Sequence, residues 1–433
     1  LSSGVANAAV SHITFSNYND KKISLQNKGI RIFGNNGSAT VAQDLEPEYI
    51  AFTHDESMAY VSCQENNALA VIDLSNNQLL DILPLGYKNH SLGSPNIDLY
   101  NVNQLATSWP ALGTPVYNGG QPTVYLGGFS GMFYAANEST NNQSVFYVVP
   151  DRGPNDEPVA KANVTPAASQ NLRPYKLPDY QARIVKLTLN HSTGSVSLDN
   201  QIMLTRQDGT TPITGSGNIA GYDEVPVTYT DPATAYSDSD YVDANGTYYH
   251  ELPYDYLAGD MEGIIIDKNG DFWICDENRP AIYQFAHNGT LKHRYVATGT
   301  SLLGDTTKPA GTFGEETLPA IYSKRWANRG FEGIAYDSAS HTVYAFIQSP
   351  LYNPGSVTKN NSDVIRILGV DANNGTPVSE YVYLLERNKY NGYSSSRTDK
   401  IGDACYVGDN KLLVIERDSE GPTVPEGKKY IFE

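Results

Sequence analysis

The chain has 433 residues, a formal net charge of −18 and a hydrophobic content of 40%, so it can bury a sizeable core while repelling polyanions. Nucleic acid is excluded as a partner, because such binding depends on Lys and Arg contacts with phosphates. No run approaches the roughly 18 uninterrupted apolar residues that a transmembrane helix requires, and three cysteines are too few for a disulfide framework.

The predicted elements are mainly β-strands, because Tyr, Val, Ile and Thr alternate with Gly, Pro, Asn and Asp turns. Residues 1–88 are predicted to form β-propeller blades from two units, Ile30–Phe33 and the segment beginning at Glu48. Residues 89–124 are polar and without a clear period, which indicates a connector. Residues 125–433 contain the larger set of repeats and are also predicted to form a β-propeller. The N-terminal blades either stand apart from it or belong to the same propeller.

A strand–turn–strand unit recurs along the chain, each copy opening on an acidic or small residue and an apolar strand. The second strand of each copy ends in a polar cluster. Internal repetition of this kind predicts a β-propeller, an all-β fold built from antiparallel hairpins with long loop inserts. The copies begin at Glu48-Tyr49, Ser130-Gly131, Glu262-Gly263, Glu332-Gly333 and Asp403-Ala404.

The repeat predicts where acidic side chains collect. In an antiparallel hairpin, the start of the first strand lies beside the end of the second, so Glu332 should meet Gln348. If the hairpins are radial blades, these ends share one face of the disk. The alternative is that each acid caps its own hairpin. The other expected groupings are Glu262 with Asp276 and Glu277, Asp403 with Glu416 and Asp418, and Glu48 with Glu65.

Two long inserts, 155–179 and 208–257, interrupt the repeat, and inserts on one face of a β disk commonly shape a binding site. The acid-rich face would repel a phosphorylated substrate unless arginines or divalent cations bridge the two. Carboxylate oxygens are hard ligands that suit calcium, so calcium is the expected cation.

Glycosylation sequons indicate the compartment. Asn-x-Ser/Thr occurs about twice as often as chance predicts, mostly in predicted turns or inserts. We therefore expect a secreted, extracellular or cell-surface protein carrying N-linked glycans; the alternative is a polar surface without sugar. The sequons lie at Asn36, Asn89, Asn137, Asn142, Asn163, Asn190, Asn245, Asn288, Asn360 and Asn374.

Several motifs from Tyr125 to Glu433 resemble a phytase-like domain family described as having esterase-like activity. The N-terminal part is similar to choice-of-anchor I β-propeller proteins, on Asp44–Ala51 and Gln64–Asp73. The motifs of the longer resemblance are Gly127–Gly131, Val149–Asn155, Asp260–Ile264, Phe272–Glu277, Arg329–Ile334 and Ile415–Asp418.

The resemblance implies a β-propeller that hydrolyses a small phosphoester or another ester. By analogy with calcium-dependent propeller phytases, acidic residues would hold calcium. Arg152 and Arg279 would grip phosphoryl oxygens, and Asp151 would orient water or act as general base. The carboxylates that would face the metal are Glu262, Asp276, Glu277, Glu332, Asp403 and Glu416.

A second hypothesis is non-catalytic. An acidic, tyrosine-rich glycoprotein could be an extracellular or cell-surface component whose carboxylates bind structural calcium, or a chain that pairs with its neighbours in an assembly. Turnover separates the two hypotheses, because a scaffold would show calcium-dependent stability without hydrolysis.

Overall fold

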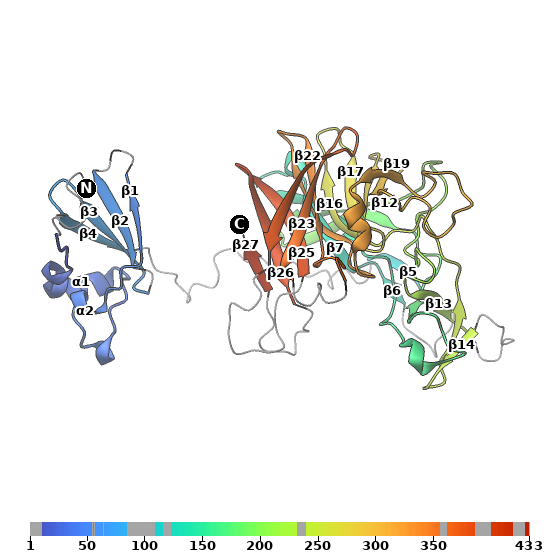
Figure 1. Ribbon diagram of the computed structural model, residues 1–433, viewed down its shortest axis with the longest axis horizontal. Helices are drawn as coiled ribbons and strands as arrows, with labels where there is room; N and C mark the ends of the chain where they lie inside the picture. The colour runs from blue at the N-terminus through green and yellow to red at the C-terminus, as the bar shows by residue number, and fades with distance from the viewer. Residues whose placement is uncertain are drawn as a thin grey trace. The chain divides into compact units, whose positions relative to one another are not determined.

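Antiparallel hairpins are the building unit of this protein (Figure 1). A computed structural model describes residues 11–53, 55, 57–63, 65–84, 109–115, 123–231, 240–355, 362–385, 400–418 and 429–432. The chain divides into two units, Leu1–Asp98 and Leu99–Glu433. That division falls within the segment predicted as the connector, most of which lies outside the described residues. Most strand pairs in the described part of the chain are antiparallel, as the prediction of antiparallel hairpins requires.

The first unit carries one four-stranded antiparallel sheet in sequence order. The sheet follows short helical segments, the 3-10 helices Ser16–Lys21 and Asn35–Gly37 and the α-helices α1 (Lys22–Asn27) and α2 (Val41–Asp44). Its strands are β1 (Tyr49–Phe52), β2 (Met58–Cys63), β3 (Ala68–Asp73) and β4 (Gln78–Pro84).

The predicted strand Ile30–Phe33 is wrong. This segment runs between helices without a strand partner, although Ile30 and Ile32 are fully buried. Its backbone is satisfied without a sheet, since the Ile30 N–H donates to the carbonyl of Leu25 and the Arg31 N–H donates to the carbonyl of Asn66, in the turn between β2 and β3. The alternation of apolar residues therefore reflects burial on one side of the segment rather than a sheet.

In the second unit, four sheets have the blade form, and each begins with a hairpin of the predicted repeat. The first is β7 (Phe129–Tyr134), β8 (Gln143–Pro150), β11 (Arg183–Asn190) and β12 (Ser195–Met203). The second is β16 (Met261–Ile266), β17 (Phe272–Asp276), β18 (Ala281–Phe285), β19 (Leu291–Ala297) and β20 (Glu315–Leu318). The third is β21 (Phe331–Asp337), β22 (Thr342–Ile347), β23 (Val364–Asp371) and β24 (Pro377–Leu384). The fourth is β25 (Lys400–Gly408), β26 (Lys411–Arg417) and β27 (Lys429–Phe432).

The two inserts fold together into a sheet of their own, in the order β10-β13-β15-β14-β9. Its parallel pair, β10 with β13, joins the first insert to the second. The strands are β9 (Val164–Thr165), β10 (Leu172–Tyr175), β13 (Val225–Tyr229), β14 (Asp240–Asp243) and β15 (Tyr248–Glu251). The remaining short elements are β5 (Ala111–Gly113), β6 (Val124–Tyr125) and the 3-10 helices Ala136–Glu138, Lys161–Asn163 and Ala320–Lys324.

The first strands of the blades, β7, β16, β21 and β25, lie side by side in that order. Glycine permits this approach. A Cβ on Gly131 would lie 2.2 Å from the Glu262 carbonyl oxygen, and one on Gly263 would lie 2.8 Å from the Ile334 nitrogen. The recurring glycine of the repeat is therefore the contact point between neighbouring blades.

The residue before each of these glycines lies at a break in the pairing register. Ser130, Glu262 and Glu332 have no partner residue on the adjoining strand, as in a β-bulge. In the fourth blade the break falls at Gly402, and Asp403 takes the position that glycine holds elsewhere. The copy expected to open on Asp403-Ala404 is thus shifted by one residue.

The hydrophobic core fills the space between neighbouring blades. Tyr147 of the first blade packs against Phe272 of the second, with ring centroids 5.4 Å apart. Trp273, on the opposite side of β17, stacks on Tyr295 and belongs to a cluster that includes Phe331 of the third blade. No helix in the described part of the chain is long and apolar enough to cross a membrane.

Candidate metal centre

The ends of three hairpins bring five carboxylates together. Glu262 and Glu332 lie at the bulges of β16 and β21, and Glu277 directly follows β17. Asp151 follows β8, and Asp260 precedes β16. The ligand oxygens of Glu262, Glu277 and Glu332 lie within 4.8 Å of one another.

A second triad shares one of these residues. Oxygens of Asp151, Asp260 and Glu262 also lie within 4.8 Å of one another, so Glu262 belongs to both groups. The Ser130 hydroxyl donates a hydrogen bond to Glu262 Oε2 and thereby orients it. We call these five carboxylates the carboxylate cluster.

Burial and mutual repulsion disfavour the charged forms. Glu262, Glu277 and Glu332 are only 4–6% exposed. Burial, followed by the charges of Glu332 and Glu277, raises the pKa of Glu262 well above its usual value. Burial and the charge of Glu332 raise the pKa of Glu277 to about 8, against the opposing effect of Arg152. The surrounding side chains therefore do not compensate the full ionisation of these three acids.

The chemistry of this donor set fits a hard divalent cation. All five side chains offer carboxylate oxygens, the ligands that Ca²⁺ and Mg²⁺ prefer. Asp260 is fully buried, and its Oδ1 atom has no hydrogen-bond partner among the described residues. An orphaned buried carboxylate oxygen is costly, and a cation would satisfy it.

Arg152 connects the carboxylate cluster to the second insert. Its Nη2 atom donates to Asp260 Oδ2 and to Asn328 Oδ1. The same atom lies 3.9 Å from Glu277, and Nη1 lies 4.0 Å from Glu224 of the second insert. The guanidinium is 6% exposed, so it works as a buried counter-charge that fixes the position of Asp260.

Glu332 is held from two sides. Gln348 Nε2 donates to Glu332 Oε2 at 2.6 Å, and this contact confirms the predicted pairing of Glu332 with Gln348. Arg417 Nη2 donates to Oε1 at 3.0 Å. Burial still raises the pKa of Glu332, although Arg417 and Gln348 both oppose that shift.

Asp276 and Arg279 lie next to the cluster in sequence, but their side chains bond elsewhere. Asp276 accepts hydrogen bonds from Tyr283 Oη at 2.8 Å and from the Asn278 N–H. Arg279 donates through Nε to Asn218 and through Nη1 and Nη2 to the Thr300 and Leu303 carbonyls. Both groups hold the loop after β17 in place.

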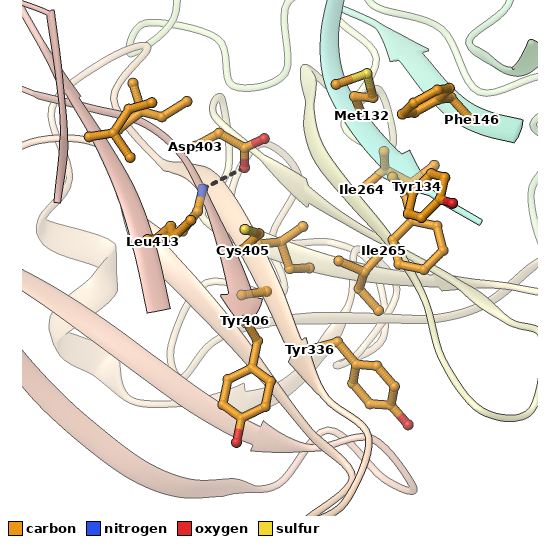
Figure 2. A pocket seen from close by; sticks show the side chains of 16 residues that line it. Met132, Tyr134, Phe146, Ile264, Ile265, Tyr336, Asp403, Cys405, Tyr406 and Leu413 are labelled. Carbon is orange, nitrogen blue, oxygen red and sulfur yellow. Dashed lines mark hydrogen bonds between the residues drawn. The ribbon is translucent and has the colours of Figure 1, made fainter. Parts of the chain in front are cut away.

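Asp403 faces an apolar cavity instead of the carboxylate cluster. Figure 2 shows it beside Cys405, with Ile264 and Ile265 across the space and its carboxylate bonded to a backbone N–H. The cavity has a volume of about 500 Å³ and runs along β7, β16, β21 and β25. Burial raises the pKa of Asp403 to about 7.

Glu416, expected to group with Asp403, belongs to neither carboxylate triad. Glu416 is buried and accepts a hydrogen bond from Tyr383 Oη. Glu48 and Glu65 belong to the first unit, where the Glu48 N–H pairs with the Ser62 carbonyl beside β2.

Sequence reasoning missed several residues around the cluster. Asp260 stood in a quoted motif without a role, and Ser130 occupies the repeat position that Glu262 and Glu332 hold. Repeat alignment could have found Ser130, whereas the positions equivalent to Asp260 are Gly128 and Gly330. Asn328 and the insert residues Asp223 and Glu224 carry no repeat pattern, so only the folded chain reveals them.

The sequons are distributed over exposed turns. Asn190 is half-buried, and Asn89 and Asn360 lie outside the described residues. The exposed asparagines are Asn36, Asn137, Asn142, Asn163, Asn245, Asn288 and Asn374.

A curated protein is similar to part of the chain. A protein of Arthroderma benhamiae, described as "Uncharacterized secreted protein", is 27% identical over 259 residues, which cover 55% of this chain and 48% of the relative. The chain thus spans about half the length of this curated relative.

Solved structures resemble the chain only distantly. Kuenenia stuttgartiensis hydrazine synthase covers 90% of this chain and 63% of its own at 9% identity and a TM-score of 0.26. The match to the Dos1 propeller covers 88% of this chain and 55% of the propeller chain, at 9% identity and a TM-score of 0.24. The match to a Bacteroides vulgatus member of the DUF4221 family covers 90% of this chain and 94% of that protein's chain, at 11% identity and a TM-score of 0.25. TM-scores this low carry no argument about the site.

Family models match in the order that the sequence motifs suggested. The choice-of-anchor I domain matches residues 1–117. The phytase-like family, described as "Esterase-like activity of phytase", matches residues 124–433. This second match spans well over half of the chain and contains the whole carboxylate cluster, and the protein therefore belongs to the phytase-like family.

Proposed function

We propose that the protein is a secreted hydrolase that cleaves phosphoesters with a bound divalent cation, calcium in the first instance. The observation that carries this proposal is the pair of carboxylate triads that share Glu262. Family membership supports it, since the family's description names phytase and esterase-like activity.

Glu262, Glu277 and Glu332 are the residues proposed to hold the cation, because their oxygens converge and their pKa values are raised. When bound, a divalent cation supplies a Lewis acid that attracts phosphoryl oxygens to an otherwise repulsive acidic surface. Ser130 and Gln348 orient two of the ligands through their hydrogen bonds.

Asp151 is the proposed general base. Its side chain is 46% exposed, the most accessible of the carboxylate cluster, so water can reach it. The Arg152 N–H donates to Oδ1, which leaves Oδ2 to take a proton from the attacking water as its oxygen bonds to phosphorus. The P–O bond to the leaving group breaks, the departing oxygen takes a proton from solvent, and Asp151 later releases its proton to solvent, so the products are the alcohol of the substrate and phosphate. Arg152 acts by positioning Asp260.

Hydrolysis of p-nitrophenyl phosphate tests this function. The wild-type protein should turn over with CaCl₂ and lose turnover in EDTA, and Glu262→Gln should remove it. Glu157→Gln changes an exposed glutamate in the first insert and is the matched control. Equal rates in EDTA, or calcium-dependent stability without turnover under any divalent cation, would overturn the proposal; the second result would favour the non-catalytic role.

Secretion and glycosylation form the second part of the proposal. The relative described as a secreted protein and the seven exposed sequons support it. Deglycosylation of protein expressed through a eukaryotic secretory pathway should lower its mass, whereas an unchanged mass would argue for a bare polar surface.

A further inference from the structure

A second, polar cavity of about 190 Å³ lies where the inserts meet the hairpin ends beside the carboxylate cluster. This volume is below the roughly 300–1,000 Å³ of sites that bury a drug-sized ligand, so it suits a single small ring. Arg152 lines the cavity and also bonds to Asp260, so the cavity adjoins the cluster. Other lining residues are Tyr175, Tyr222, Asp223, Glu224, Asn278 and Asn328.

The charges around this cavity are already paired. Arg173 of the first insert binds both oxygens of Glu224, at 2.5 and 3.0 Å. Arg325 lies 3.3 Å from Asp223, and Arg152 is bonded to Asp260. An anion would therefore meet acidic side chains whose arginines are committed, so the cavity favours a neutral ligand.

The hydrogen-bonding groups of the cavity match hydroxyls. Asn278 is 3% exposed, and its Nδ2 atom has no partner in the described part of the chain. A buried donor left unsatisfied is destabilising, and a ligand oxygen would satisfy it. Asp223 and Glu224 present carboxylate oxygens, which accept from hydroxyls. A hydroxyl both donates and accepts, so it satisfies both kinds of group.

Tyr222 adds an apolar surface at the cavity. Its hydroxyl donates to the Arg325 carbonyl oxygen at 2.5 Å, which fixes the ring, and the residue remains 41% exposed. Aromatic rings with a fixed polar end suit ligands that are apolar on one face and polar at the edge.

We propose that this cavity binds one neutral, sugar-like ring. The inference rests on the proposed function, in which the ring is the part of the substrate next to the phosphoester. Asn278 donates to a ring hydroxyl, Asp223 and Glu224 accept from others, and Tyr222 contacts the C–H face.

Saturation-transfer NMR in EDTA, with the methyl glycosides of glucose, mannose and galactose, tests the site without any need for turnover. At least one glycoside should give transfer that the size-matched cyclohexanol does not. Asn278→Ala should reduce it by at least about fivefold, whereas Asn200→Ala, an exposed asparagine on β12, should leave it unchanged. Tyr222→Ala, at an exposed position, should also weaken it and provides a second variant if Asn278→Ala fails to fold.

The outcomes separate this site from the hydrolase. Glycoside binding that Glu262→Gln retains, without hydrolysis in any condition, would support the cavity and overturn the proposed function. Calcium-dependent hydrolysis without glycoside binding would do the reverse. Transfer equal to that of cyclohexanol, transfer unaffected by both variants, or binding of inorganic phosphate that Asn278→Ala abolishes would overturn the sugar site.

Discussion

The Ser130 hydroxyl of β7 donates a hydrogen bond to the Glu262 carboxylate of β16, so two neighbouring blades are linked at the carboxylate cluster itself. Glu262 is also the residue common to both triads. The site is consequently a property of how blades pack, and substitutions at this contact should affect stability and cation binding together.

Glu262→Gln should have opposite effects with and without calcium. In EDTA the variant should unfold at a higher temperature than wild type, because a buried, mutually repelling acid is removed. The affinity of the variant for calcium should be at least about tenfold lower than that of wild type, since one carboxylate ligand is lost. Thermal unfolding and calorimetric titration measure the two effects, with Glu157→Gln as control. A variant that binds calcium as wild type does would contradict the assignment.

Arg152→Met should destabilise the fold by about 3 kcal/mol or more, because it leaves the buried Asp260 carboxylate without its partner. Arg366→Met, which breaks a half-exposed pair with Glu380 at 2.6 Å, should cost at most about 1 kcal/mol. Urea unfolding in EDTA compares the two variants. Similar losses would show that Arg152 is not the buried counter-charge described here.

Gly263→Ala should destabilise the protein by about 1–3 kcal/mol through overpacking, because the new methyl group would meet the Ile334 and Glu332 backbone at 2.8 and 3.1 Å. It should also weaken calcium binding, since it separates the strands that carry Glu262 and Glu332. Gly127→Ala, whose methyl group would meet nothing within 4 Å, is the control. Unchanged stability and affinity in both variants would refute the close-contact interpretation.

Asp403→Asn tests a pH dependence. The pKa of Asp403 is about 7 when folded and 3.8 in its unperturbed state, so the folded chain binds more protons between these values. Proton binding to Asp403 therefore stabilises the folded chain. This contribution is fully present below about pH 4 and is lost as the pH rises through 7. The variant should therefore be more stable than wild type by up to about 4 kcal/mol at pH 8 and by little at pH 4. Equal differences at both pH values in EDTA would be inconsistent with a buried, titrating carboxyl.

The hairpin repeat predicted the β fold and the meeting of Glu332 with Gln348, because both follow from antiparallel pairing. The sequence could not predict that Glu277 joins the carboxylate cluster while Asp276 bonds to Tyr283. Adjacent residues at a strand end point in opposite directions, so the repeat pattern alone does not say which of the two reaches the cluster. Glu224 could not be predicted either, because the pairing of β10 with β13 joins segments about 50 positions apart without a local pattern.

The insert sheet has an evolutionary consequence. Tyr175, Asp223 and Glu224 reach the polar cavity from segments that no blade needs for closure, whereas Glu262 and Glu332 stand at strand contacts that tolerate little change. Substitutions in the two inserts can therefore reshape the polar cavity while the carboxylate cluster keeps its arrangement.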